Sequence, residues 1–415
     1  MRKDALSRML ATEICNANSI ADALLMYRSF AQFLTEYKFV FAAEKGGAPG
    51  FAVNRSFSSG AAVRSIFGTP NVFVLDRQTF ADMDKNGPVD YPLDYSISMD
   101  TEAMSYLHPF IAGSPNNGIP GDFKEVFAFI AEDKVNVDPT PYMCENILKL
   151  DEQKLADGVF KTLRSYEILR TLDKSRFHTK GEICSLLTDA EVDARALELI
   201  SGMYRDRSNH SAMAGLHARH SYFYLCLLKM AEIQIKSPRR STKHKLIEFI
   251  TFCDEEMATL FARETAIAAA YFERGHDLTF FGKIHKGKSL HEPLKNMAWD
   301  LCHVRQLEEG MTMLPVREAR YFFTALLTFD KRLIEIIDLY PLRSFGFKVS
   351  GDVQISNYGG DLIDNVFTSD LDRASLRERF LSSGALDSRS SRRSQVRKDL
   401  PDIVARMEGA IARWS

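Results

Sequence analysis

The stretch LKNMAWDLCHVRQLEEGMTMLPVREARYFFTALLTFDKRLIEIIDL, residues 294–339, predicts a helix, a loop, a buried strand and a second helix. Asp300 lies within the first helix, whose neighbouring positions are largely apolar. Asp330 directly follows FFTALLTF, a run of the apolar, aromatic and β-branched residues typical of buried strands. Parallel α/β sheets bind ligands at the carboxyl ends of their strands. An acid in this position therefore predicts a site at that edge.

The segment YSISMDTEAMSYL, residues 95–107, repeats the same order of strand, acid and helix. Its first residues alternate around Ile97, Asp100 follows at once, and helical spacing then resumes. We therefore expect Asp100, Asp300 and Asp330 to converge, although each acid alone could equally be a helix cap or a salt-bridge partner.

A fourth acid is expected from EEMATLFARETAIAAAYFERG, residues 255–275, within a helix predicted over Thr242–Arg274. Glu264 shares a helix face with apolar residues, so its carboxylate is predicted to point inward or into a cleft. Three nearby acids remain alternatives for this position: Glu255, Glu256 and Glu273. Crowded carboxylates raise one another's pKa values, and a hard cation such as Mg²⁺ or Mn²⁺ relieves that conflict.

In this order the segments resemble the motifs of the PIN-like nuclease family. YSISMDTEAMSYL is similar to the family's first motif, NMAWDLCHVRQLE to its later Asp-bearing helix, and LLTFDKRLIEI to its closing strand with Thr-x-Asp. The family's order of acids carries over onto Asp100, Glu264, Asp300 and Asp330 as metal-binding and catalytic residues. Thr328 matches the Thr or Ser beside the last acid.

The resemblance implies a metal-dependent endonuclease that cleaves phosphodiesters, with RNA favoured over DNA, and Lys331 is either a phosphate contact or a helix-surface residue. Many PIN-like proteins act as bacterial toxins or in phage defence, which is family context only. Two features depart from the family: Glu102 stands where Asn is usual, and Asp100 and Asp300 are 200 positions apart.

The predicted fold class is therefore α/β, with a PIN-like parallel-sheet core enlarged by a large, mainly helical insertion. The expected organisation is a mixed region over 1–90, a core formed by 91–121 and 242–350, and a helical insertion over 122–241. A hairpin, a helix and a basic tail follow over 351–415, in which DSRSSRRSQVRK (387–398) is expected to be mobile.

Two alternative functions remain open. The first is a catalytically silent PIN-like scaffold that binds a regulatory protein partner. The second is a metal-independent HEPN-type ribonuclease, because RDRSNH, from Arg205 to His210, matches that family's Arg-x4-His pattern. His210, His217 and His220 could share a helix face as a metal cluster, although an interhelical polar patch is the favoured interpretation. Homo-oligomerisation also remains open.

Length and composition limit the classes of protein that fit this sequence. With 415 residues, 45% of them hydrophobic, the chain can bury a sizeable core, and its formal charge of −2 gives no overall signature of polyanion binding. The six cysteines form no CxxC pair, which suits a reducing compartment. No apolar run is long enough to span a bilayer, so we expect a cytoplasmic protein without membrane contact.

Overall fold

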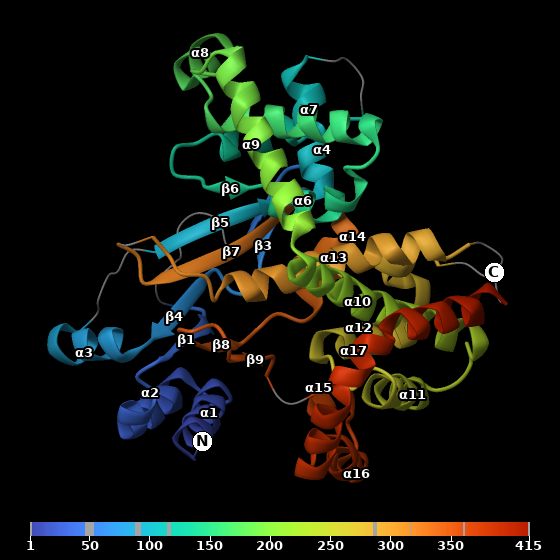
Figure 1. The fold of residues 1–415 in the computed structure, drawn as a ribbon. Helices are drawn as coiled ribbons and strands as arrows, with labels where there is room; N and C mark the ends of the chain where they lie inside the picture. Colours follow the sequence, from blue (N-terminus) through green and yellow to red (C-terminus); the bar gives the residue numbers. More distant parts are fainter. Residues whose placement is uncertain are drawn as a thin grey trace.

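Figure 1 shows the protein as a computed structural model, which describes residues 2–45, 54–87, 93–113, 118–284, 289–316, 318–359 and 362–413. The glycine-rich residues 46–50 and Trp414 lie outside these residues.

A five-stranded sheet lies at the centre of the molecule (Figure 1), and two of its strands end just before Asp100 and Asp330. Its strand order is β2-β3-β7-β5-β6. The strands are β2 (Asn54–Ser56), β3 (Ala62–Ser65), β5 (Leu93–Met99), β6 (Val137–Asp138) and β7 (Tyr321–Thr328). β5 runs parallel to β6 and β7, whereas β3 is antiparallel to both β7 and β2. The fold is thus mixed α/β, and the expectation of a purely parallel sheet is wrong at the β2–β3 edge.

The register of β5 and β7 decides where their acids lie. Met99 is paired with Leu327, so the two strands end at the same edge of the sheet. Seven of the eight residues in β7 are buried, as expected for a strand covered on both faces. Because β5 ends at residue 99 and β7 begins at residue 321, everything in between is a connection between two neighbouring parallel strands.

A second, antiparallel sheet has the order β4-β1-β8-β9. Its strands are β1 (Tyr37–Ala43), β4 (Asn71–Leu75), β8 (Ser344–Lys348) and β9 (Gln354–Asn357). The β8–β9 pair confirms the hairpin predicted from the glycine-punctuated sequence after Leu339. The N-terminal helices lie beside this sheet (Figure 1): α1 (Arg2–Cys15), α2 (Ile20–Phe30), the short η1 (Ala31–Phe33) and α3 (Arg77–Asn86).

One group of helices lies beyond the β6 edge of the central sheet (Figure 1). It comprises α4 (Thr101–Ile111), α5 (Phe123–Ile130), α6 (Thr140–Asn146), η2 (Ile147–Lys149), α7 (Gln153–Arg170), α8 (Lys174–Lys180) and α9 (Asp189–Ser208). Their apolar faces form one core with β5 that includes Ile97, Leu107, Phe123 and Phe127.

A second group of helices packs around α10 (His210–Lys236) and α13 (His291–Gly310), the helix that carries Asp300. Its other members are α11 (Thr242–Glu255), α12 (Ala262–Arg274), η3 (Gly275–Asp277), η4 (Thr279–Phe281), α14 (Lys331–Leu339), α15 (Leu362–Val366), α16 (Asp370–Leu381) and α17 (Ser383–Ala412). The predicted helix over Thr242–Arg274 is therefore two helices. They are separated by a bend at which Ala258 has a φ of 46°, a left-handed conformation that a continuous helix cannot contain.

The basic segment 387–398 is helical, which corrects the expectation of a mobile tail. It lies within α17, where the Arg389 side chain donates to Asp254 over 2.8 Å. The Arg392 guanidinium donates to the carbonyls of Asp254 and Glu255, which end α11. These contacts satisfy carbonyls that a helix C-terminus leaves without intrahelical partners, and they hold the arginines against the body.

The expected organisation into regions stays a prediction, but strand pairing joins its parts closely. β3, from the region 1–90, is hydrogen-bonded to β7, and β1 is hydrogen-bonded to β8. Within the described residues, no helix has the length and apolar character needed to cross a membrane. All six cysteines are free thiols.

Candidate functional site

Asp100 lies at the junction of β5 and α4. Its backbone N–H donates to the Leu327 carbonyl of β7, and its Oδ1 accepts the Ala103 N–H over 2.7 Å as an N-cap. The residue is only 5% exposed. Burial, helped by the charges of Glu102 and Asp330, raises the pKa of its carboxyl to about 7, although hydrogen bonds from Ala103 and Thr328 act in the opposite direction.

Asp330 occupies the equivalent junction between β7 and α14. Its amide donates to the Thr328 hydroxyl over 3.1 Å, and Thr328 also hydrogen-bonds to Asp100, so this threonine lies between the two strand-end acids. The Arg332 side chain clasps the Asp330 carboxylate, with Nε 2.9 Å from Oδ1 and Nη2 2.6 Å from Oδ2. Burial would raise the pKa of Asp330, but the hydrogen bonds from Arg332 outweigh it and hold the pKa below its usual value.

Asp300 reaches the same place from α13. The Asp300 carboxyl makes no hydrogen bond to any described residue. Burial, together with the charges of Asp330, Asp100 and Glu145, raises its pKa well above the usual value. Part of the Asp300 residue is exposed at the pocket wall. An acid without a hydrogen-bond partner among the described residues, surrounded by like charges, is available to bind a cation.

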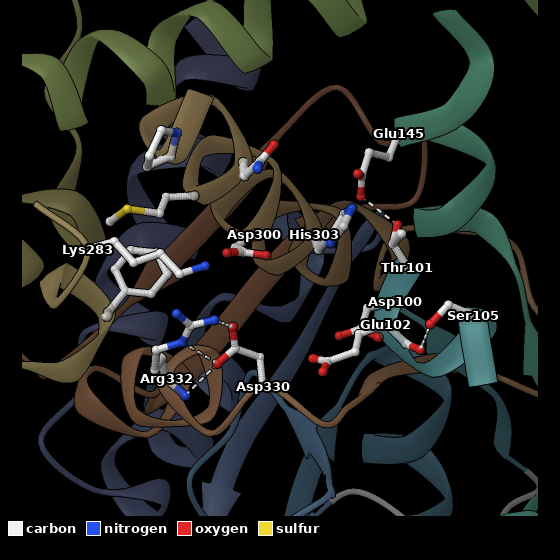
Figure 2. A pocket seen from close by; sticks show the side chains of 14 residues that line it. Asp100, Thr101, Glu102, Ser105, Glu145, Lys283, Asp300, His303, Asp330 and Arg332 are labelled. Carbon is white, nitrogen blue, oxygen red and sulfur yellow. Dashed lines mark hydrogen bonds and ion pairs between the residues drawn. The ribbon is translucent and has the colours of Figure 1, made fainter. Parts of the chain in front are cut away.

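These acids line one pocket of about 290 Å³ (Figure 2). The lining residues are Asp100, Thr101, Glu102, Ser105, Glu145, Phe280, Lys283, Pro293, Asn296, Met297, Asp300, His303, Asp330 and Arg332. We call this hollow the acidic pocket. Its five carboxylates come from α4, α6, α13 and the strand-end junctions, so the tertiary fold alone brings them together. Asp100, Asp300 and Asp330 therefore line one pocket, whereas their role as metal ligands stays a prediction.

Glu264 does not line the acidic pocket. It lies in the first turn of α12, 1% exposed, where its Oε2 has no hydrogen-bond partner among the described residues. Burial raises the pKa of Glu264, and the Arg305 charge opposes that shift. The prediction assumed one helix over Thr242–Arg274. The bend at Ala258 ends that helix early, and the first turn of α12 is buried beside the charges of Arg263, Arg305 and Glu308.

The other glutamates considered for this role lie elsewhere too. Glu255 and Glu256 form ion pairs with Arg379 of α16 and Arg406 of α17, and Glu273 is exposed outside the acidic pocket. Lys331 is also absent from the lining, because its stem lies across Gly60, where an added Cβ would be 2.1 Å from Lys331 Cε.

Sequence reasoning missed four ionisable lining residues: Glu145, Lys283, His303 and Arg332. Glu145 on α6 accepts a hydrogen bond from the Thr101 hydroxyl (Figure 2). A signal for it exists, because VNVDPTP (135–141) is a third strand followed by a turn and a helix, and β6 does pair with β5. His303 follows Asp300 by three positions on α13, a spacing that places both on one helix face.

His303 and Lys283 differ sharply in environment. His303 is 2% exposed, and neither ring nitrogen makes a hydrogen bond to a described residue. Burial lowers its pKa to about 4; the nearby Glu145 charge and Pro141 carbonyl oppose this shift without completing a hydrogen bond. Lys283 is exposed, lies on the other side of Asp300 from His303, and forms no ion pair with a described residue (Figure 2).

The donor set suits a hard divalent cation, since carboxylate oxygens are the ligands Mg²⁺ and Mn²⁺ prefer, and Asp300 has an uncommitted carboxyl. As the side chains lie, no three His, Cys, Asp or Glu residues in the described part of the chain are grouped closely enough to hold one ion. The hydrogen bonds from Arg332 to Asp330 contribute to this spacing, because they hold that carboxylate in place.

The residues behind the two alternative interpretations, the Arg-x4-His pattern and the histidine cluster, lie outside the acidic pocket. Arg205 lies in the last turn of α9 and His210 begins α10, and both side chains are exposed outside the acidic pocket. His220 Nε2 lies 3.0 Å from the Lys295 carbonyl, and the ring packs on Trp299 at 4.6 Å, as expected for an interhelical polar patch.

A scan against protein-family models, a search of curated proteins and a search of solved structures each found no match to this chain.

Proposed function

We propose that this protein is a metal-dependent endonuclease of PIN-like type that hydrolyses phosphodiesters, with RNA as the favoured substrate. The observation that carries the proposal is the meeting of Asp100, Asp300 and Asp330 in one pocket from three separated parts of the chain. Two aspartates end adjacent parallel strands and the third projects from a packed helix, which is the arrangement expected from the motif resemblance.

The charges in the pocket support a phosphodiester as substrate. Arg332 and Lys283 are cationic groups on the wall of the acidic pocket, where they can bind the oxygens of a phosphate. A polyanion would otherwise be repelled by the five carboxylates. Bound Mg²⁺ or Mn²⁺ would offset the negative charge and activate water for attack on phosphorus.

Asp100, Asp300 and Asp330 would hold the cation, with Glu145 in the role that the sequence had given to Glu264. The carboxylate of Glu145 is oriented by the Thr101 hydroxyl, and that of Asp330 by Arg332. Thr328 contacts both strand-end acids and fixes their separation. The residues of the chain therefore bind the phosphate, orient the ligands and keep the acids at one edge of the sheet.

The test is cleavage of single-stranded and duplex RNA and DNA by the purified protein in Mg²⁺, in Mn²⁺ and in EDTA. Asp300→Asn should lower cleavage by about 100-fold or more, as is typical when a charge-stabilising group is removed from an active site. Asp387→Asn, at an exposed position on α17, is the matched control and should cleave as the unaltered protein does.

Two outcomes would overturn the proposal. Cleavage that persists in EDTA but is lost in Arg205→Ala or His210→Ala would assign the HEPN-type mechanism instead. Failure to cleave any of the four substrates with either metal, together with no metal binding, would favour the silent scaffold.

A further inference from the structure

A second hollow, of about 790 Å³, lies between the N-terminal helices, the antiparallel sheet and the start of α12. It is lined by Thr12, Cys15, Asn16, Ala17, Asn18, Ser19, Ile20, Phe41, Ala42, Thr69, Ala262, Arg343, Ser344, Ile355, Ser356, Asn357, Tyr358, Gly359 and Leu362. We call it the hairpin pocket, since much of its wall is the β8–β9 hairpin. It shares no lining residue with the acidic pocket.

The charge of the hairpin pocket is opposite to that of the acidic pocket. Its described lining residues include no aspartate or glutamate, and Arg343 is the charged residue among them. Arg343 is exposed and forms no ion pair with a described residue. A lone guanidinium facing a hollow of neutral polar groups is available to an anion from solution.

The backbone at Gly359 leaves room for the side chain of Arg343. Gly359 has a φ of +90°, and a Cβ added there would lie 2.2 Å from Arg343 Nε. Only a glycine therefore lets the guanidinium rest against the chain at this point. The turn itself is fixed by Asn357, whose Oδ1 accepts the Gly359 N–H over 2.8 Å and whose Nδ2 donates to the Cys15 carbonyl over 2.7 Å. The wall carrying Arg343 is thus tied to the end of α1.

Neutral hydrogen-bonding groups complete the lining. The side chains of Asn16, Asn18 and Ser356 make no hydrogen bond to any described residue, and all three line the hollow. Amide and hydroxyl donors in the same hollow as an arginine suit a phosphate, whose terminal oxygens can accept several hydrogen bonds at once. The volume falls within the range of about 300–1,000 Å³ that is usual for small-molecule sites.

We propose that the hairpin pocket binds a small phosphorylated molecule, with Arg343 as the residue that recognises the phosphate. The site is separate from the acidic pocket and does not depend on the proposed nuclease activity. The organic part of the ligand would occupy the remainder of the hollow, next to the edges of Phe41 and Tyr358.

The test is isothermal titration calorimetry on the full-length protein in EDTA. Inorganic phosphate, ribose 5-phosphate and adenosine 5′-monophosphate are the charged probes, and adenosine is the uncharged control. We expect saturable binding of the phosphate esters and none of adenosine. Arg343→Ala should weaken binding about 10- to 100-fold, the range expected for losing hydrogen bonds to a charged group. Arg239→Ala removes an exposed arginine outside the hollow and should bind as tightly as the unaltered protein.

Gly359→Ala provides a second variant, because its Cβ would displace the guanidinium without removing the charge. It should also weaken binding, and a thermal melt of each variant checks that the fold is retained. Binding of ribose 5-phosphate and the nucleotide alike would indicate a general phosphate-ester site, and binding of the nucleotide alone a base-selective one. The proposal is overturned if no phosphate probe binds, if adenosine binds as tightly as its monophosphate, or if Arg343→Ala leaves the affinity unchanged.

Discussion

Arg332 holds the carboxylate of Asp330 in a two-pronged ion pair, with Nε–Oδ1 and Nη2–Oδ2 distances of 2.9 and 2.6 Å. This ion pair distinguishes Asp330 from Asp100 and Asp300, the other two aspartates of the acidic pocket. The pKa of Asp330 is lowered, whereas burial raises those of Asp100 and Asp300. One acid is therefore kept ionised while two are poised to take up a proton or a cation.

Arg332→Ala should raise the pKa of Asp330, because burial would then be opposed only by the backbone N–H groups of residues 332 and 333, without the guanidinium. Carbon-13 NMR titration of the labelled aspartate carboxyls would measure the shift. Lys331→Ala, one position earlier but outside the pocket, is the control and should leave the titration unchanged. An unaltered Asp330 titration in Arg332→Ala would contradict this account of the ion pair.

Asp100→Asn should change how stability depends on pH. The folded carboxyl has a pKa of about 7 against the ordinary 3.8, so between these values the folded state binds more protons than the unfolded state. The free energy of unfolding therefore falls as pH rises from about 4 to 7, and asparagine, which cannot ionise, removes that fall. We expect the variant to be more stable at pH 8 by about 1–4 kcal/mol and about equal at pH 4, measured by urea denaturation. An equal difference at both pH values would exclude the buried carboxyl as its cause.

Divalent cations should stabilise the protein through the same acids. At pH 8, Mn²⁺ at about one hundred times its Kd should add about 2.7 kcal/mol to the free energy of unfolding, and EDTA should reverse the effect. Asp300→Asn should lose most of this stabilisation, whereas Asp387→Asn should keep it. Equal stabilisation of both variants, measured by thermal melts, would place the bound ion outside the acidic pocket.

Glu145→Gln and Glu264→Gln should separate the two candidates for the fourth acid. Glu145 lines the acidic pocket, so its amide variant should lower cleavage and weaken Mn²⁺ binding by about tenfold or more. Glu264 is buried outside that pocket, so Gln should leave Mn²⁺ affinity within about twofold. Because burial raises the pKa of Glu264, the neutral side chain should also leave stability at pH 8 unchanged or higher. Metal affinity that depends on Glu264 and not on Glu145 would reverse this assignment.

Glu308→Ala should be strongly destabilising. The carboxylate is 1% exposed on α13, where it pairs with Arg263 over 3.0 Å and with Arg305, and it accepts the Tyr358 hydroxyl over 2.7 Å. Its loss leaves a buried guanidinium uncompensated, at a cost of about 3–5 kcal/mol. Tyr358→Phe removes one hydrogen bond and should cost about 1–3 kcal/mol. Chemical denaturation would measure both, and an equal cost would show that the arginines do not depend on Glu308.

Local sequence patterns predicted the strand–acid–helix units well. β5 and β7 end within a residue or two of Asp100 and Asp330, and both acids cap the helices that follow, because period-two burial and capping are short-range properties. The pattern failed at Glu264, where the bend at Ala258 reoriented α12. It also failed over 387–398, where contacts with α11, distant in sequence, stabilise a basic helix that composition alone indicated as mobile.

The sequence by itself determined the order of the elements and the three aspartates of the acidic pocket. This is because periodicity, capping and buried-strand composition are written into neighbouring residues. Only the tertiary structure decided which further ionisable groups line the pocket, since Glu145, Lys283 and His303 reach it from segments whose direction depends on packing. The hairpin pocket likewise exists only because α1, the β8–β9 hairpin and α12 meet, and no stretch of sequence encodes that meeting locally.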